Sequence, residues 1–119
     1  MLIKDLKDCK EFIAGDNTTF RELLNAKTEN LEIRYSLGEA IVQPGKKSRP
    51  HALKTTEVYF ILSGKGIMHI NQETRAVSSG QMIYIPPKSQ QYIENISDID
   101  LKFLCIVDPA WRKEDEEII

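Results

Sequence analysis

The chain has 119 residues, the usual length of one domain, and its 41% hydrophobic and 29% charged residues are typical of a globular protein with one core. Lys and Arg number 16 against 18 Asp and Glu, so the net charge of -2 provides no concentrated basic face and argues against nucleic acid as a partner. No window approaches the roughly 20 consecutive apolar residues of a membrane helix, which argues against membrane insertion.

The first residues alternate charged with apolar side chains and lack the uninterrupted apolar stretch of a signal peptide. The two cysteines, Cys9 and Cys105, lie far apart and share no metal-type spacing. We therefore expect a cytoplasmic protein in which both thiols are free. Cys105 lies within an apolar run and is interpreted as a buried small hydrophobe.

Residues 1–30 are only weakly patterned. The segment from residue 2 to residue 12 is compatible with an edge strand, and Thr19 with Glu22 three positions later forms a capping-box pattern. This pattern predicts a short helical turn over residues 19–24. The segment is longer than a minimal barrel needs, so we expect residues 1–30 to pack as an extension on the barrel or on a partner.

From residue 31 onward apolar residues alternate with polar ones, which is the period of a β-strand. Gly, Pro and Asn residues separate the apolar runs and indicate turns. Strands are expected at residues 31–37, 40–42, 57–62, 67–70, 74–77, 82–85, 91–94 and 101–107. Many short strands with no long amphipathic helix between them predict an all-β fold, an antiparallel sandwich or barrel over residues 31–108.

Asp108 and Pro109 begin a different segment, because Asp is a strong N-cap and Pro is favoured at the first helical position. We expect a short helix or an ordered tail over residues 109–119. The charged run at residues 113–117 is interpreted as a solvated face.

Two histidines occur, and their surroundings differ. His69 lies between Met68 and Ile70, which share the other face of a strand and make the better core pair, so His69 is interpreted as an exterior residue. His51 precedes the strand that carries Glu57. A His and a carboxylate on adjacent inward positions form a mixed nitrogen and oxygen site that suits Zn, Mn, Fe or Ni.

The spacing around these two residues resembles the first motif of the cupin superfamily, a Gly, five residues, His-X-His, three or four residues, Glu, six residues and Gly. Here Gly45 is followed after five residues by His51, and Glu57 is followed after six residues by Gly64. Leu53 stands where the motif has its second His.

The second cupin motif is similar to the segment that starts at Gly80. Five residues separate Gly80 from Pro86, and Asn95 ends the motif. Lys88 replaces a Gly of the motif, and Gln91 replaces its His. The resemblance covers residues 31–107 and implies a jelly-roll barrel, with short helical segments at both ends of the chain.

The resemblance also implies a metal site, since cupins commonly bind one divalent metal through three His and one Glu. His51, Glu57 and Gln91 would form a reduced set of ligands, in which the Gln amide oxygen is a weaker donor than imidazole. The alternative is a metal-free polar pocket in which these three side chains satisfy one another by hydrogen bonds.

Two functions follow from these alternatives. The first is a metal-dependent enzyme of the isomerase, dioxygenase or decarboxylase class that acts on a small polar metabolite or sugar, with Glu57 or Tyr59 moving protons. Tyr59 is included because it shares the face of Glu57 on one strand. The second is a non-catalytic cupin that binds a metabolite or serves as a structural dimer. In both cases we expect a homodimer, because open sheet edges favour pairing.

Overall fold

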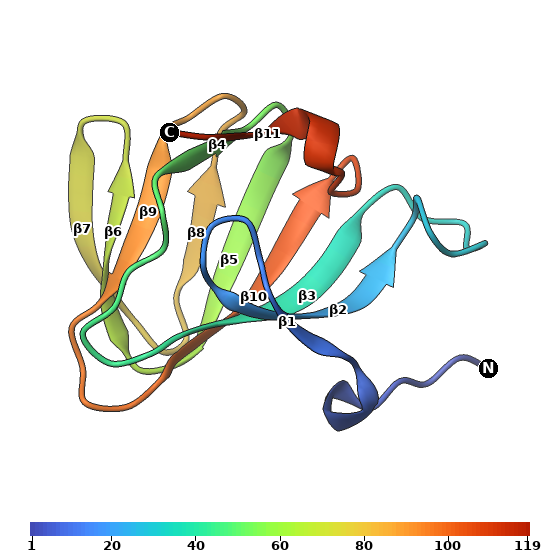
Figure 1. The fold of residues 1–119 in the computed structure, drawn as a ribbon, viewed down its shortest axis with the longest axis horizontal. Coiled ribbons are helices and arrows are strands. Elements are labelled where there is room, and N and C mark those ends of the chain that lie inside the picture. The colour runs from blue at the N-terminus through green and yellow to red at the C-terminus, as the bar shows by residue number, and fades with distance from the viewer.

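Backbone pairing divides the chain into two antiparallel sheets, shown in Figure 1 for the computed structural model of residues 1–119. The six-stranded sheet has the order β1-β2-β3-β10-β5-β8, and the five-stranded sheet has the order β11-β4-β9-β6-β7. No strand belongs to both sheets. The all-β antiparallel fold is therefore confirmed, but the sheets form a sandwich and do not close into a barrel.

The strands vary in length from three to eight residues. The six-stranded sheet consists of β1 (Glu11–Ile13), β2 (Thr19–Asn25), β3 (Ser36–Val42), β5 (Thr56–Ser63), β8 (Met82–Ile85) and β10 (Leu101–Asp108). The five-stranded sheet consists of β4 (His51–Leu53), β6 (Lys65–Ile70), β7 (Glu73–Ser78), β9 (Gln91–Asn95) and β11 (Glu116–Ile118). The helical segments are two short 3-10 turns, η1 (Leu6–Asp8) and η2 (Lys113–Asp115).

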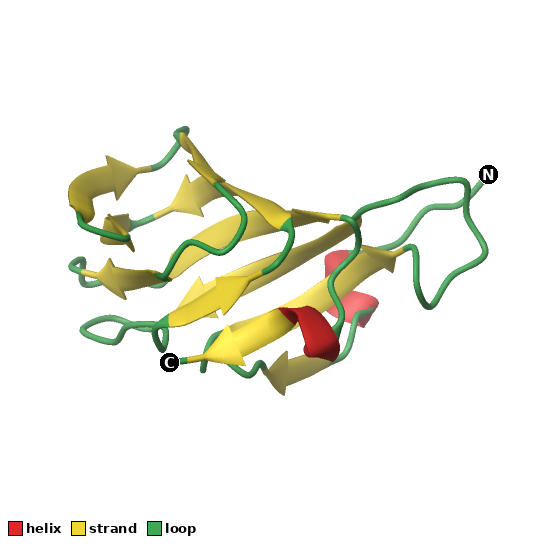
Figure 2. Ribbon diagram, turned by 90° about the horizontal axis from the view of Figure 1, so that it is seen from above, coloured by secondary structure: helices red, strands yellow, loops and turns green.

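The hydrophobic core fills the space between the two sheets, which Figure 2 shows from above. Inward residues alternate with outward residues along each strand, as expected when two sheets pack face to face. Strand β10 lies between β3 and β5, and its residues Leu101 and Phe103 are almost completely buried. Ile61 and Ile93 reach the same core from β5 and β9.

The predicted strands from residue 57 to residue 107 are confirmed within one or two residues at their ends. The prediction for residues 31–37 is wrong over its first part, because the strand begins only at Ser36 and continues through Gly38 to Val42. Gly38 does not interrupt β3. Its missing side chain leaves room for the ring of Phe20, which would clash with a Cβ atom at this position.

The predicted helical turn at residues 19–24 is wrong, because this segment forms β2 and pairs with β3. A capping box acts only when the chain turns into a helix, and here the pairing with a neighbouring strand overrides the local preference. The expected C-terminal helix is also wrong in extent. Only residues 113–115 are helical, and the chain then continues as β11 along β4.

The N-terminal segment extends the six-stranded sheet. Lys4 donates hydrogen bonds to the Leu23 carbonyl at 2.8 Å and to Glu29 at 2.6 Å, which attach the first residues to the rest of the chain. Cys9 and Cys105 are both free thiols, as expected. Neither helical turn has the length or the apolar character needed to cross a membrane. A cytoplasmic location stays a prediction.

Candidate functional site

A cavity of about 160 Å³ lies between the two sheets, against the inner face of β3, β10 and β5, and residues near both ends of the chain line it. An apolar cavity of roughly 150 Å³ can hold a benzene molecule, so this space accommodates one small molecule. The polar and charged lining residues include Asp16, Glu22, His51, Glu57 and Glu116. The apolar lining residues include Phe12, Ile13, Phe20, Leu37, Val107 and Trp111.

His51 is held in the cavity wall by the first position of β4 and is only 2% exposed. Its Nδ1 atom lies 2.8 Å from the carbonyl oxygen of Arg49. Because a carbonyl only accepts hydrogen bonds, Nδ1 carries the proton that is donated. The Nε2 atom then faces Oδ2 of Asp16 at 3.7 Å, beyond hydrogen-bond distance.

Glu57 lies on β5 and is 6% exposed. Its Oε1 atom accepts a hydrogen bond from the Gln91 amide at 2.8 Å. Burial raises the pKa of Glu57 from 4.5 to about 8, and the negative fields of Asp16 and Glu116 act in the same direction, while the bond from Gln91 opposes them. The carboxyl is therefore mostly protonated at neutral pH.

Gln91 connects Glu57 to Tyr59. The Gln91 amide oxygen accepts a hydrogen bond from the Tyr59 hydroxyl at 3.0 Å, and its amide nitrogen donates to Glu57. Burial raises the pKa of Tyr59 well above its usual range, and Glu57 adds to this effect. The Tyr59 proton is thus directed at Gln91 within the protein. Hydrogen bonds thus join Glu57, Tyr59 and Gln91, and their catalytic and metal-binding roles stay predictions.

Asp16 is a cavity residue that the sequence analysis did not single out. It belongs to the turn between β1 and β2, where its Oδ1 accepts hydrogen bonds from the backbone and hydroxyl of Thr18 at 3.1 and 2.7 Å. The Asp16 carbonyl accepts the Arg49 amide at 2.7 Å. One peptide segment, around Arg49, therefore positions both Asp16 and His51.

Glu116 is the second carboxylate that sequence reasoning missed. Strand β11 pairs with β4 and places Glu116 opposite Leu53, at the cavity. Its Oε2 accepts a hydrogen bond from the Trp111 indole at 3.3 Å. Burial raises the pKa of Glu116, although nearby His51 and the bond from Trp111 act against the shift.

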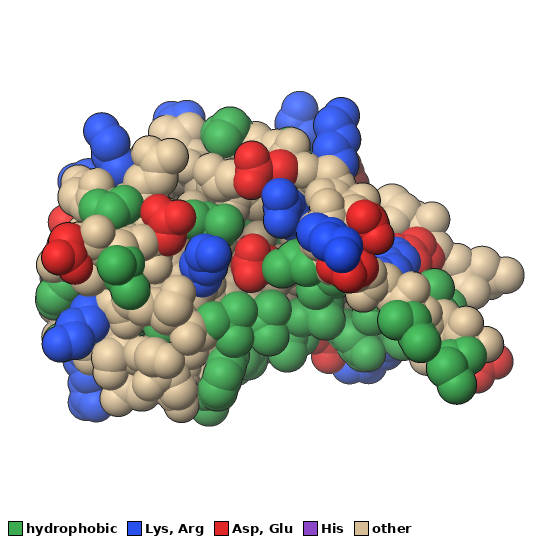
Figure 3. All heavy atoms as spheres, turned by 90° about the horizontal axis from the view of Figure 1, so that it is seen from below, with side chains coloured by type: hydrophobic (Ala, Val, Ile, Leu, Met, Phe, Trp, Pro, Cys, Tyr) green, Lys and Arg blue, Asp and Glu red, His purple; other side chains and the backbone are tan.

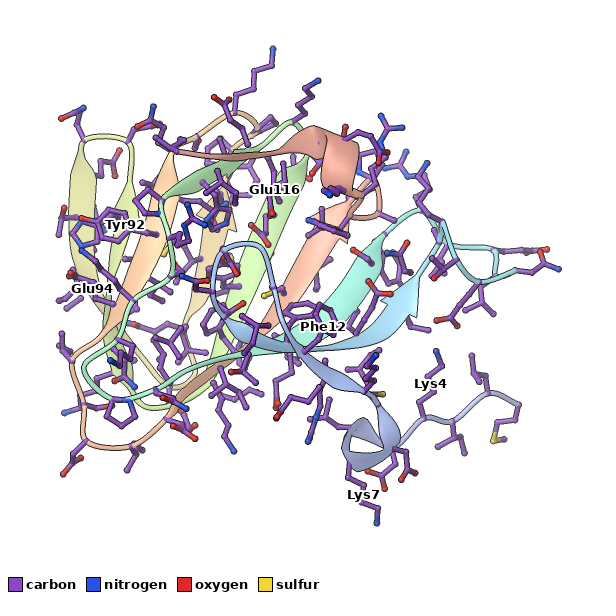
Figure 4. The ribbon with its side chains drawn as sticks, viewed as in Figure 1. Lys4, Lys7, Phe12, Tyr92, Glu94 and Glu116 are labelled. Carbon is purple, nitrogen blue, oxygen red and sulfur yellow. The ribbon has the colours of Figure 1, made fainter.

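The interpretation of residues 113–117 as a solvated face is wrong at two positions. Asp115 is 9% exposed and forms a two-point contact with Arg112, at 2.8 and 3.2 Å. Glu116 faces the cavity, where Phe12 from β1 also lies (Figure 4). Residues from opposite ends of the chain thus line one space.

A metal site of the kind that the motifs imply needs three or four strong donors around one point. No group of three or more His, Cys, Asp or Glu side chains is arranged to hold a metal ion. Leu53 offers no ligand, and Gln91 turns its amide nitrogen toward Glu57 and its oxygen toward Tyr59. These residues do not fit a tightly held transition metal. The set of His51, Glu57 and Gln91 as metal ligands stays a prediction.

His69 lies on the outer face of the five-stranded sheet, as the sequence predicted. Its ring stacks on Tyr92 at a centroid distance of 4.0 Å, and its Nε2 lies 3.1 Å from Glu94. Tyr92 and Glu94 are labelled in Figure 4. This cluster is separate from the cavity.

Three comparisons place the chain among known proteins. Residues 38–107 match the family model Cupin_2, described as a cupin domain. An uncharacterized protein from Methanocaldococcus jannaschii is 41% identical over 111 residues, covering 92% of this chain and 88% of that protein. The oxalate-binding protein from Thermotoga maritima is 31% identical over 51 residues, 43% of this chain and 42% of that protein. An oxalate decarboxylase structure from Bacillus subtilis shares the fold, with a TM-score of 0.81, 21% identity and coverage of 96% of this chain and 31% of that one.

The buried Glu57 carboxyl predicts a specific pH dependence of stability. Its pKa is about 8 in the folded protein and 4.5 when exposed, so the folded state holds one more proton between these values. The free energy of unfolding should therefore fall as the pH rises from about 4.5 to about 8. Glu57→Gln removes this contribution. Between pH 4.5 and pH 8, the free energy of unfolding of the variant should therefore rise relative to that of wild type by on the order of 4 kcal/mol.

Urea unfolding at several pH values measures this difference. Glu73→Gln, at an exposed position on β7, is the matched control and should follow the wild-type profile. Parallel profiles for Glu57→Gln and wild type would contradict the assignment of a neutral carboxyl.

Proposed function

Because this chain belongs to the cupin family, we propose that it binds one small molecule in the cavity between its sheets. Three polar atoms carry the proposal: Nε2 of His51, Oδ2 of Asp16 and Oε2 of Glu57. Each belongs to a cavity-lining residue that is at least nine-tenths buried, and none forms a hydrogen bond within the protein. These atoms open onto the cavity, so a molecule bound there can form hydrogen bonds with them.

The rest of the cavity supports this proposal. Its wall is largely apolar, with a few polar groups that converge from different strands, which is the usual composition of a ligand site. The name of the Thermotoga maritima relative makes oxalate one compound to test.

A second candidate is a proton-transfer enzyme of the isomerase or decarboxylase class. The observation that favours it is the raised pKa of Glu57, since a general acid or base works best when its pKa lies near the working pH. Glu57 would exchange the proton with the substrate. Tyr59 would position Glu57 indirectly, because the Tyr59 hydroxyl donates a hydrogen bond to Gln91 and the Gln91 amide donates one to Glu57.

Filling the cavity should abolish binding. Cys105 lines the cavity from β10, and Cys105→Met adds two heavy atoms of side-chain volume there, while Cys105→Ala keeps the space open. Ligand-observed NMR with oxalate and with neutral or charged compounds of about benzene size measures binding. We expect at least one compound to bind wild type and the Ala variant, and to bind the Met variant roughly 10-fold more weakly or not at all.

Thermal unfolding of both variants confirms that each is folded before binding is compared. Equal binding by wild type and Cys105→Met would place the ligand outside this cavity.

Metal affinity tests the predicted ligand set directly. Wild type should bind Zn, Mn, Fe or Ni weakly, because one strong ligand position holds Leu53 and another holds Gln91. The double variant Leu53→His/Gln91→His should bind at least about 10-fold more tightly, and His51→Ala in that background should reverse the gain. Competition with a chelating dye measures these affinities. No gain in the double variant would argue against the proposed positions.

We also propose that the protein is a homodimer. Five exposed apolar side chains lie on β5, β8 and β10 of the six-stranded sheet, and Figure 3 shows a band of hydrophobic side chains along one side of the molecule. Large exposed apolar patches are uncommon on monomers. The five residues are Phe60, Leu62, Met82, Tyr84 and Ile106.

Light scattering coupled to size exclusion tests this proposal at micromolar concentration. We expect twice the mass of 13.6 kDa for wild type and a monomer for Tyr84→Lys. Ile99→Lys, at an exposed position elsewhere, should remain dimeric. A monomeric wild-type protein would overturn the proposal.

A further inference from the structure

We propose that the ligand of the cavity is a small ammonium compound with an apolar body, an inference that rests on the proposed small-molecule function. The hydrogen-bonding atoms of the lining, its charge and the shape of the space favour such a ligand.

Most of the unsatisfied lining atoms are acceptors. Oδ2 of Asp16 and Oε1 of Glu116 accept no hydrogen bond, although each residue is held in place through its other oxygen. Nε2 of His51 is also an acceptor in the neutral ring, because Nδ1 donates to Arg49. A ligand that satisfies these atoms must therefore bring several donors.

Three of the side-chain donors in the wall are already used within the protein. The Thr18 hydroxyl donates to Asp16, the Trp111 indole donates to Glu116, and the Tyr59 hydroxyl donates to Gln91. No Lys or Arg side chain lines the cavity. A carboxylate or phosphate would find only the neutral Glu57 carboxyl and the Ser36 hydroxyl as unused side-chain donors, and it would meet the charge of Asp16.

The charge of the cavity favours a cation. Asp16, Glu22 and Glu116 are acidic lining residues, and His51 is the only basic one. A positive charge near a carboxylate in a partly buried site gains several times what it would gain in water. An ammonium group also supplies up to three N–H donors, which matches the number of unsatisfied acceptors.

The walls set the shape of the rest of the ligand. Phe12, Phe20, Tyr59 and Trp111 line the same space, and aromatic faces attract cations as well as apolar groups. The volume of about 160 Å³ corresponds to a body of about benzene size. Benzylamine therefore represents the proposed class as a probe.

Three compounds of nearly the same shape separate the effect of charge from that of size. Benzylamine is cationic near neutral pH, benzyl alcohol is neutral, and benzoate is anionic. In calorimetric titrations of the full-length protein, we expect benzylamine to bind at least about 10-fold more tightly than benzyl alcohol, and benzoate to bind not at all.

The outcomes distinguish this inference from the proposed function. If benzyl alcohol binds as tightly as benzylamine, or if benzoate binds most tightly, the inference fails while small-molecule binding stands. If none of the three binds, both fail.

Asp16→Asn tests the role of charge without changing the shape of the cavity. The Asn oxygen can still accept the hydrogen bonds from Thr18, so we expect the turn to be retained. Benzylamine should bind about 10-fold more weakly, whereas the affinity of benzyl alcohol should not change. Glu116→Gln provides a second variant with the same expectation, and Glu73→Gln is the control. An equal loss for amine and alcohol would overturn the charge argument.

Discussion

The burial of the Glu57 carboxyl is the constraint on which the rest of the site depends. A carboxylate between two sheets loses its hydration, which raises the pKa of Glu57 to about 8 and keeps it neutral at physiological pH. The Gln91 amide makes this burial tolerable by donating to one oxygen, and Tyr59 fixes the orientation of that amide. In the cupin motif, position 91 carries a His. The change to Gln therefore replaces a metal-type ligand with a hydrogen-bond partner for the acid.

The two ends of the chain decide the chemical character of the cavity. The match to the cupin domain covers residues 38–107, which include His51 and Glu57. Asp16 and Glu116 lie outside this range, yet both reach the cavity, one through the turn after β1 and the other through β11. The common fold thus supplies the central His and Glu and most of the cavity wall. The terminal segments supply most of the acidic side chains and cover the cavity.

Local patterns in the sequence failed where long-range pairing competed with them. Thr19 and Glu22 have the spacing of a helix start, but their segment forms a strand that pairs with β3. There Phe20 packs on Gly38. Residues 109–119 carried a helix-start signal as well, and only three of them are helical because β4 offers an open edge to β11. A local signal describes one segment, and the edge that a segment pairs with lies elsewhere in the chain.

The sequence by itself determined the antiparallel all-β class and most strands after residue 57, and it predicted that His51, Glu57 and Gln91 lie together. Alternation and turn residues report which face of a strand is buried, and motif spacing reports which inward positions coincide. Only the tertiary structure revealed that Asp16 and Glu116 join this group and that the Gln91 amide points its nitrogen at Glu57. The reason is physical: side-chain orientation and contacts between distant segments are set by packing and hydrogen bonding in three dimensions, which no local period encodes.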